Sequence, residues 1–232
     1  MWVDRGDYWE STAPQGSEIW HQCRRGRVNG SNTGALAGKT TLKSIEDTGK
    51  IIAGVLVEEF KQKNIDAMSH GHEYESTCRI WYEKNHKCKV LERSLAVCKT
   101  DYRIGASIDG EIIGKDGIIE IKAPLKLWKP IVQYMDAKSQ GWKPPENYHD
   151  HIWETHYCQM QQSMFVLKKK YCDYIVYSTE DSKVFTQRIF FDLVYWNNHY
   201  EIIKKNYEKY VRPYLVTPYP LTPYPLIPSV YS

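Results

Sequence analysis

The 232-residue sequence has no long apolar run, no closely spaced cysteine pair and no large excess of one charge sign. The longest apolar stretch, residues 51–57, is far shorter than the roughly 20 residues that a membrane helix needs, and no signal peptide opens the chain. None of the six cysteines forms a CxxC pair, so we expect reduced thiols in an intracellular protein without a membrane partner. The formal net charge of +3 excludes an obvious polyanion-coating protein, although a local basic groove is compatible with it.

Aromatic residues are abundant, with 18 tyrosines and 8 tryptophans, and they suit a large core with some rings available to stack on bases. The length fits one domain, which we place at residues 1–212 with a core at about 18–191. Residues 213–232 are a tail rich in proline and tyrosine that repeats Thr-Pro-Tyr-Pro-Leu. Proline at this density favours polyproline II, so the tail is either a segment lying over the surface or a docking peptide.

Hydrophobic periodicity predicts helices first, then an antiparallel-rich sheet, then a crossover helix and more strand. This order indicates an α/β fold with a mixed central β-sheet flanked by helices. The predicted helices cover residues 17–25, a short segment from Ser31, 44–63, 66–85, 151–168 and 193–210, and the predicted strands lie within 88–122, 173–178 and 184–191. We expect a loop at 136–148 and a short helix or turn between Pro124 and Pro130.

Residues 105–122 have the pattern of a β-hairpin. Residues 114–117, Gly-Lys-Asp-Gly, are a turn signal between two strand-like runs. A two-residue loop at the centre of this signal would place Asp109 opposite Lys122 and diagonal to Glu120.

Alternation along the strands places the charged residues of this hairpin on one face. Asp109, Glu120 and Lys122 share that face, whereas Ile119 and Ile121 point into the opposite layer. Two carboxylates held together repel unless a cation lies between them, and hard oxygen ligands favour Mg²⁺ or Mn²⁺. A bound ion with an ammonium beside it is a device for hydrolysing phosphodiesters, although the same pattern also fits an exposed hairpin with surface charges.

The spacing of Asp109, Glu120 and Lys122 resembles the PD-(D/E)xK nuclease motif, with Ile108 in the position of its proline. The flanking Gly-Ala-Ser at 105–107 and Ala-Pro at 123–124 resemble the lambda-exonuclease (YqaJ-type viral recombinase) branch. This resemblance implies a restriction-endonuclease-like core and one or two Mg²⁺ or Mn²⁺ ions.

The same resemblance implies further members of the catalytic site. Tyr74-Glu75 matches a Tyr-Glu pair in the helix before the sheet, and it assigns Glu75, but not Glu73, to the metal site. The backbone carbonyl of Ile121 is implied as a further metal ligand. In the Gln-Met-Gln of residues 159–161, Gln159 is implied to hold the lysine or the water, and Gln161 is expected to be structural.

Residues 20–31 carry a second match to the family. A tryptophan, an arginine four residues later, a glycine and a helix-capping serine make an anion site from side chains and a helix N-terminus. In the family this pocket binds the terminal 5′-phosphate of DNA, which implies that role for Arg24, Ser31 and Ser107. We also considered possible DNA contacts at Trp20, Arg25 and Arg27.

The resemblance implies a metal-dependent 5′-to-3′ exonuclease that acts on double-stranded DNA ends in the cytoplasm or nucleus of an infected host cell. It implies a possible homotrimer and a possible single-strand annealing protein as partner. An endonuclease or RecB/Cas4-like nuclease on the same core, and a non-catalytic DNA-binding or assembly protein, stay open as alternatives. A zinc cluster of His149, His151 and His156 near Cys158 fits no common zinc spacing, so we do not expect one.

Overall fold

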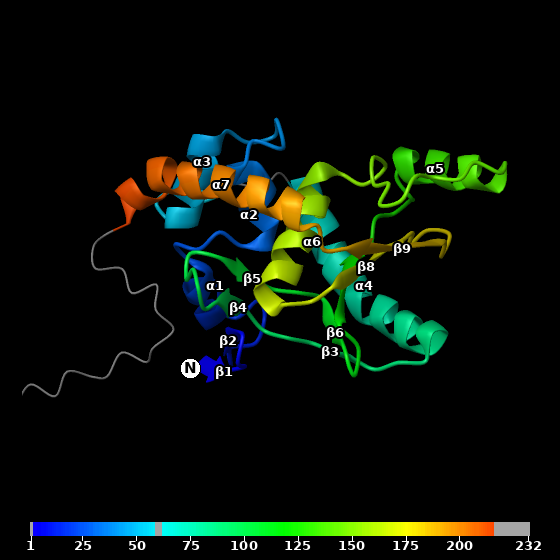
Figure 1. The fold of residues 1–232 in the computed structure, drawn as a ribbon, viewed down its shortest axis with the longest axis horizontal. Coiled ribbons are helices and arrows are strands. Elements are labelled where there is room, and N and C mark those ends of the chain that lie inside the picture. Colours follow the sequence, from blue (N-terminus) through cyan, green and yellow to red (C-terminus); the bar gives the residue numbers. More distant parts are fainter. Residues whose placement is uncertain (1, 59–61, 216–232) are drawn as a thin grey trace, which may run out of the picture.

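The computed structural model of the protein describes residues 2–58 and 62–215 (Figure 1). The two Thr-Pro-Tyr-Pro-Leu copies of the tail lie outside these residues. In chain order the elements are β1 (Trp2–Asp4), β2 (Tyr8–Ser11), α1 (Glu18–Arg24), α2 (Gly30–Leu36), α3 (Ile45–Ala53), α4 (Gln62–His86), β3 (Val90–Leu91), β4 (Ala96–Cys98), β5 (Gly105–Ala106), β6 (Gly110–Ile112), β7 (Gly117–Lys122), α5 (Lys129–Ser139), α6 (Glu154–Leu167), β8 (Tyr171–Tyr177), β9 (Val184–Phe190), α7 (Leu193–Tyr210) and the 3₁₀ helix η1 (Arg212–Tyr214).

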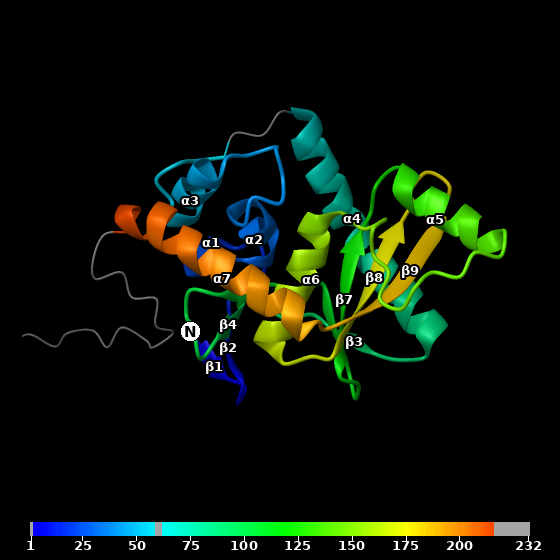
Figure 2. The same ribbon diagram turned by 45° about the horizontal axis from the view of Figure 1, so that its top comes forward.

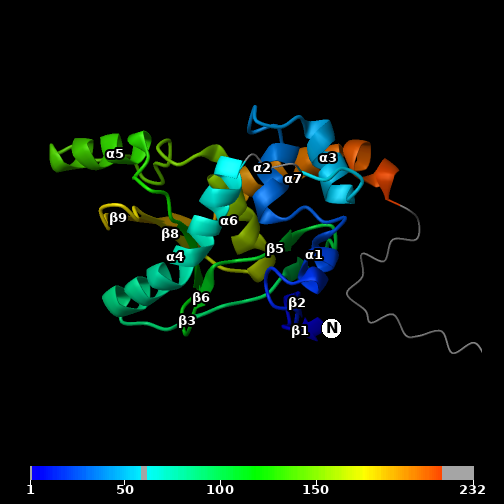
Figure 3. The same cartoon turned by 180° about the vertical axis from the view of Figure 1, so that it is seen from behind.

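The larger sheet has the strand order β3-β6-β7-β8-β9. Its central pair, β7 and β8, runs parallel, and the other neighbouring pairs are antiparallel. The parallel pair is joined by a crossover that contains α5 and α6 (Figure 2). Helix α6 packs on one face of this sheet and α4 on the other, as the view from behind shows for α4 (Figure 3). The mixed sheet flanked by helices confirms the predicted fold class.

A second, antiparallel sheet has the order β1-β2-β4-β5. The N-terminal residues, for which the sequence predicted no helix or strand, supply two of its strands. Tyr8 pairs with Cys98, and its side chain is buried. The pairing joins segments about 90 residues apart, so no local signal in the sequence marks it.

The register of the charged hairpin differs from the prediction by two residues. Gly110 pairs with Ile119, and Glu111 with Ile118, and the same register extended by one residue would put Asp109, just before β6, opposite Glu120. The predicted two-residue loop is therefore wrong, and the connection spans residues 113–116. Gly114 is the turn residue, since its φ of +73° lies in the left-handed region that glycine tolerates. A shift of two residues keeps every side chain on its predicted face.

Two helix predictions need correction. The predicted helix at 44–63 ends at Ala53, because Gly54 adopts a φ of +75° and closes α3. Residues 59–61 of that prediction lie outside the described part of the chain. The predicted loop at 136–148 is wrong in its first part, since α5 extends to Ser139 with Pro130 in its first turn. Proline is tolerated there because the first N–H groups of a helix have no intrahelical partner.

The two faces of β7 belong to separate cores. Ile118 packs with Met160 and Met164 of α6, and Ile119 and Ile121 pack in the layer under α4. This division confirms the predicted alternation of the strand. In the part of the chain that the structure describes, no helix combines the length and the apolar character needed to cross a membrane.

Buried His199 of α7 makes the stability of the fold depend on pH. Its Nε2 lies 2.8 Å from Thr33 Oγ1, and burial lowers the pKa of its imidazole from 6.5 to about 4. Because the unfolded chain then binds a proton that the folded chain rejects, stability falls as the pH drops from 6.5 towards 4. Between pH 6.5 and 5 we expect the wild type to lose about 2 kcal/mol more unfolding free energy than His199→Gln, measured by urea denaturation. Parallel pH dependences of the two proteins would contradict this assignment.

Candidate active site

The charged residues of the hairpin lie together beside the ends of β6 and β7. Lys122 Nζ is 2.7 Å from Glu120 Oε1. Asp109 Oδ2 accepts a 2.6 Å hydrogen bond from the backbone N–H of Ile121. Arg79 of α4 donates to the Asp109 carbonyl at 2.8 Å and so ties the helix to this strand. The structure therefore gathers Asp109, Glu120 and Lys122 at one place, on the predicted face.

The electrostatics of this cluster favour an added cation. Burial, and then the charge of Glu120, raise the pKa of Asp109 well above its usual range. Burial alone would lower the pKa of Lys122, but Glu120 and Asp109 outweigh it and raise that pKa. Glu120 itself is only 1% exposed. One ammonium thus faces more than one buried carboxylate, and a divalent ion would offset the remaining repulsion.

The carboxylates of Asp109 and Glu120 are the ligands that the structure brings together for such an ion, and the backbone carbonyl of Ile121 stays a ligand predicted from the family resemblance. All are hard oxygen donors, a set that fits Mg²⁺ or Mn²⁺ better than zinc. Within residues 2–58 and 62–215, no three His, Cys, Asp or Glu side chains lie close enough together to hold an ion by themselves. Backbone, water or substrate oxygens would complete the coordination, as is usual for Mg²⁺.

Two helices contribute to the surroundings of Lys122. Gln159 of α6 places its Oε1 3.5 Å from Lys122 Nζ. The charge of Glu75, on α4, acts on both Asp109 and Lys122, and its Oε1 is 3.0 Å from His72 Nδ1. Sequence reasoning missed His72, although its i,i+3 spacing to Glu75 on the predicted helix at 66–85 was a signal that could have found it.

Gln161 lies apart from this site. It is fully buried, donates to the Phe190 carbonyl and accepts from the N–H of Asp192. The two glutamines of the Gln-Met-Gln segment therefore differ in surroundings, in agreement with the structural role expected for Gln161.

Arg24, Ser31 and Ser107 form a second polar site. Arg24 Nη2 donates to Ser31 Oγ at 2.9 Å, and Nη1 lies 3.5 Å from Ser107 Oγ. The guanidinium carbon is 4.1 Å from the centroid of the Trp20 ring. Burial lowers the pKa of Arg24 to about 10, so the group remains charged at neutral pH. Since no carboxylate of the described residues pairs with Arg24, this desolvated cation is suited to an anionic ligand.

A groove of about 980 Å³ opens at this anion site. Trp20, Arg24 and Ser31 line one end, and His72, the partner of Glu75, lines it as well. Arg25 also lines the groove and donates to the carbonyl of Ala53. The groove therefore belongs to the anion site, and the close approach of Gly30 to Gln159, with the bond from Arg24 to Ser107, places that site beside the cluster of charged residues.

Arg27 does not fit the predicted contact with DNA. Its side chain is buried, with the residue 4% exposed, and it donates to the backbone carbonyls of Cys23 and Tyr102. These bonds explain its position: they join α1 to the loop before β5. We therefore remove Arg27 from the candidate DNA contacts, while Trp20 and Arg25 keep their places.

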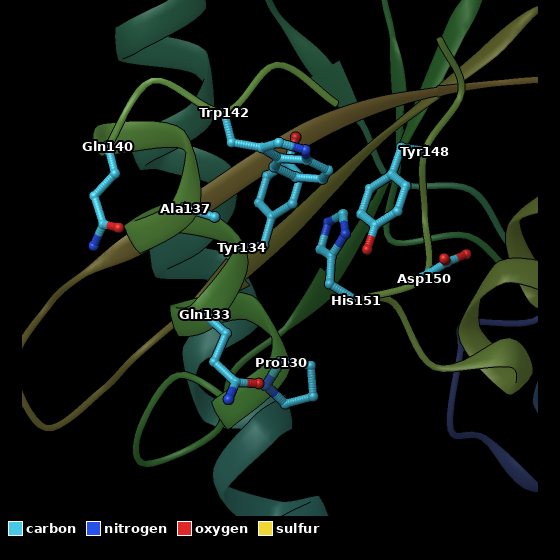
Figure 4. A pocket seen from close by; sticks show the side chains of 9 residues that line it. All are labelled: Pro130, Gln133, Tyr134, Ala137, Gln140, Trp142, Tyr148, Asp150 and His151. Carbon is cyan, nitrogen blue, oxygen red and sulfur yellow. The ribbon is translucent and has the colours of Figure 1, made fainter. Parts of the chain in front are cut away.

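A separate cavity of about 650 Å³ lies on α5 and the loop that follows it (Figure 4). Tyr134, Trp142, Tyr148 and His151 line it, with Gln133 on the helix and Gln140 directly after its end. None of the catalytic candidates borders this cavity.

The histidines near Cys158 do not form a zinc cluster. His151 Nε2 bonds Gln187, His156 Nδ1 bonds the Tyr174 hydroxyl, and the His149 ring stacks on Tyr157. All six cysteines are unpaired, in agreement with the prediction of reduced thiols.

Comparisons with known proteins identify the family and support the fold of the chain. The sequence profile of the YqaJ-like viral recombinase domain matches residues 19–174. The fold is similar to that of an alkaline exonuclease, LHK-Exo, from Laribacter hongkongensis, with 22% identity over 85% of this chain and 94% of that one and a TM-score of 0.63. The same enzyme with dAMP gives 23% identity, the same coverage and a TM-score of 0.65.

A phage-related exonuclease from Haemophilus somnus matches 81% of this chain and 93% of its own, with 14% identity and a TM-score of 0.50. No curated protein matches the sequence significantly. The structural likenesses establish the fold, and the profile covers well over half of the chain. The chain therefore belongs to the family of YqaJ-like viral recombinase domains.

Proposed function

We propose that this protein is a divalent-metal-dependent DNA exonuclease. It degrades one strand of linear duplex DNA in the 5′-to-3′ direction from a 5′-phosphorylated end, and it leaves a 3′ overhang for recombination or genome processing. The observation that carries the proposal is the cluster of Asp109, Glu120 and Lys122, with the anion site of Arg24 beside it through Ser107 and through the close approach of Gly30 to Gln159. The solved structures with this fold include alkaline and phage-related exonucleases, which supports the same reading.

The chemistry is hydrolysis of a phosphodiester. The oxygen of water forms a bond to phosphorus, the P–O3′ bond breaks, and the leaving O3′ takes a proton. Lys122, which Gln159 and Glu120 hold in place, donates hydrogen bonds that orient the water and stabilise the charge on the phosphoryl oxygens. Mg²⁺ or Mn²⁺ bound by Asp109, Glu120 and the Ile121 carbonyl, with Glu75 nearby, would polarise the phosphate and acidify water.

The anion site supports the polarity of the proposed reaction. Arg24 offers two guanidinium nitrogens, and Ser31 and Ser107 offer hydroxyls, to the oxygens of a terminal phosphate. Each cut releases a mononucleotide and leaves a new 5′-phosphate on the shortened strand. The product of one cycle is therefore the ligand that Arg24 needs for the next.

The test compares linear duplexes with a 5′-phosphate or a 5′-hydroxyl and covalently closed circles, with and without Mg²⁺. We expect release of mononucleotides from the phosphorylated duplex alone, and none from Asp109→Asn. Cutting of closed circles at the same rate would overturn the exonuclease proposal in favour of an endonuclease. If the wild type releases no nucleotides with either Mg²⁺ or Mn²⁺, a non-catalytic DNA-binding protein is favoured.

Gly30 offers a prediction about the position of Gln159. A Cβ at residue 30 would lie 2.9 Å from Gln159 Cγ, so Gly30→Ala should displace the side chain that Lys122 contacts. We expect a roughly tenfold loss of nuclease activity, equivalent to about 1.4 kcal/mol in the barrier. Gly71→Ala is the matched control, because nothing lies within 4 Å of a Cβ at that helical position. It should keep full activity and gain up to about 1 kcal/mol of stability in thermal unfolding.

If Gly30→Ala keeps wild-type activity, Gln159 is not a positioning residue for Lys122. The homotrimer, the annealing protein and the location in an infected host cell stay predictions from the family resemblance.

A further inference from the structure

The segment between Lys122 and Gln159 carries an aromatic surface that the proposed reaction does not use. It leaves the catalytic strand at the end of β7, forms α5 and returns as α6. Trp128, the residue before α5, and Trp153, the residue before α6, stack with ring centroids 4.3 Å apart and an interplanar angle of 27°. Trp153 nevertheless stays 47% exposed, so part of its indole is available to a ligand.

This tryptophan pair adjoins the catalytic cluster. The ring of His156 lies 5.4 Å from Trp128 and 5.1 Å from Trp153. Its Nδ1 is 2.8 Å from the hydroxyl of Tyr174, which pairs with Glu120 across the parallel strands. DNA bound at the catalytic carboxylates would therefore pass beside Trp128 and Trp153.

The cavity on α5 extends the aromatic surface (Figure 4). Trp142 is 40% exposed and stands at 84° to Tyr148 and 90° to Tyr134. Tyr134 stacks on His151 with centroids 3.8 Å apart. The volume of about 650 Å³ is in the range of sites for small planar ligands.

His151 supplies an unused acceptor at this cavity. Gln187 Nε2 donates to the Tyr148 carbonyl, so its Oε1 accepts from His151 Nε2 at 2.7 Å. His151 Nδ1 is then an acceptor, and among the described residues no donor reaches it, although His151 is only 5% exposed. A buried acceptor without a donor is costly, and every DNA base carries an N–H group.

We propose that this surface binds unpaired nucleobases of single-stranded DNA, with one base stacked on Trp153 and another in the cavity beside Trp142. The inference rests on the proposed function, because an exonuclease that degrades one strand of a duplex leaves the other strand unpaired. Stacking on exposed indoles accepts any base, which suits an enzyme that acts without regard to sequence.

The test measures binding of a short fluorescent oligothymidylate by anisotropy in EDTA, where no hydrolysis takes place. We expect Trp153→Ala and Trp142→Ala each to weaken binding about tenfold or more, and Trp153→Phe to restore most of it. An abasic oligonucleotide of equal length should bind weakly and equally to all variants. Ile80→Ala, which removes an exposed side chain from α4, is the control and should bind as the wild type does.

Equal binding of the oligothymidylate by wild type and both alanine variants would overturn the inference. The inference would also fail if the wild type bound the abasic strand as tightly as the oligothymidylate. A change of oligomeric state in Trp153→Ala would likewise overturn it and assign the surface to a second copy of the chain. Circular dichroism melts confirm that each variant is folded. If the tryptophan variants bind the oligothymidylate weakly but the wild type hydrolyses no DNA with Mg²⁺, the base site stands and the proposed nuclease function fails. If the wild type hydrolyses DNA and the variants bind the oligothymidylate as the wild type does, only the base site fails.

Discussion

Replacement of Lys122 by methionine is expected to reduce hydrolysis of linear duplex DNA on the order of 10³-fold. Methionine keeps an unbranched apolar stem but removes the ammonium that lies 2.7 Å from Glu120 Oε1. The carboxylates of Asp109 and Glu120 then lose their nearest positive charge. We therefore expect Mn²⁺, measured by calorimetry, to bind at least as tightly as in the wild type, while the initial rate of nucleotide release collapses.

Two further variants make this result specific. Lys126→Met removes a lysine whose side chain is 73% exposed and pairs with Glu180, and it should leave the rate unchanged. Asp109→Asn should lose both the rate and the Mn²⁺ affinity. A Lys122→Met protein that retains more than a tenth of the activity would exclude Lys122 from the reaction.

Replacement of Arg24 by methionine is expected to remove the preference for 5′-phosphorylated ends. A guanidinium that donates two charge-assisted hydrogen bonds distinguishes phosphate from hydroxyl by roughly 10²-fold, and the ratio of kcat/KM for the two substrates should fall towards one. Because Arg24 is desolvated and has no carboxylate partner among the described residues, its removal should not lower the unfolding free energy. The measurement is single-turnover cleavage of paired substrates, together with urea denaturation.

Arg25→Met is the neighbouring control. Arg25 lines the same groove but donates to the Ala53 and Gly54 carbonyls, so its loss should weaken binding to both substrates alike and keep the preference. An unchanged phosphate preference in Arg24→Met would remove the anion site from the account of polarity.

The sequence predicted the faces of the charged hairpin but not its turn. Alternation of apolar and charged residues along β7 determines which side chains share a face, and a shift of two residues does not alter that. The turn was misplaced because Gly117 looked like a turn residue. Its Cβ would lie 2.3 Å from the Tyr171 ring, so glycine is needed there for packing against a strand distant in sequence.

The other differences have the same origin in contacts that are distant along the chain. The N-terminal strand β2 pairs with β4, and the buried Arg27 donates to backbone carbonyls, and no local pattern in the sequence reveals either feature. Pro130 resembled the end of an element although it stands in the first turn of α5. Arg24, Ser31 and Ser107 came from the family resemblance, since no spacing rule joins residues so far apart.

The close approach of Gly30 to Gln159 has a consequence for the length of the product. Ser31 of the anion site follows Gly30 directly, and Gln159 contacts Lys122. Because there is no room for even a methyl group between Gly30 and Gln159, this contact fixes the position of the anion site relative to Lys122. In the proposed reaction, the terminal phosphate at the anion site and the scissile bond beside Lys122 are then a fixed distance apart. We expect the enzyme to release fragments of a single length whatever the DNA sequence. Larger side chains at this contact should give fragments of mixed length before they abolish the reaction.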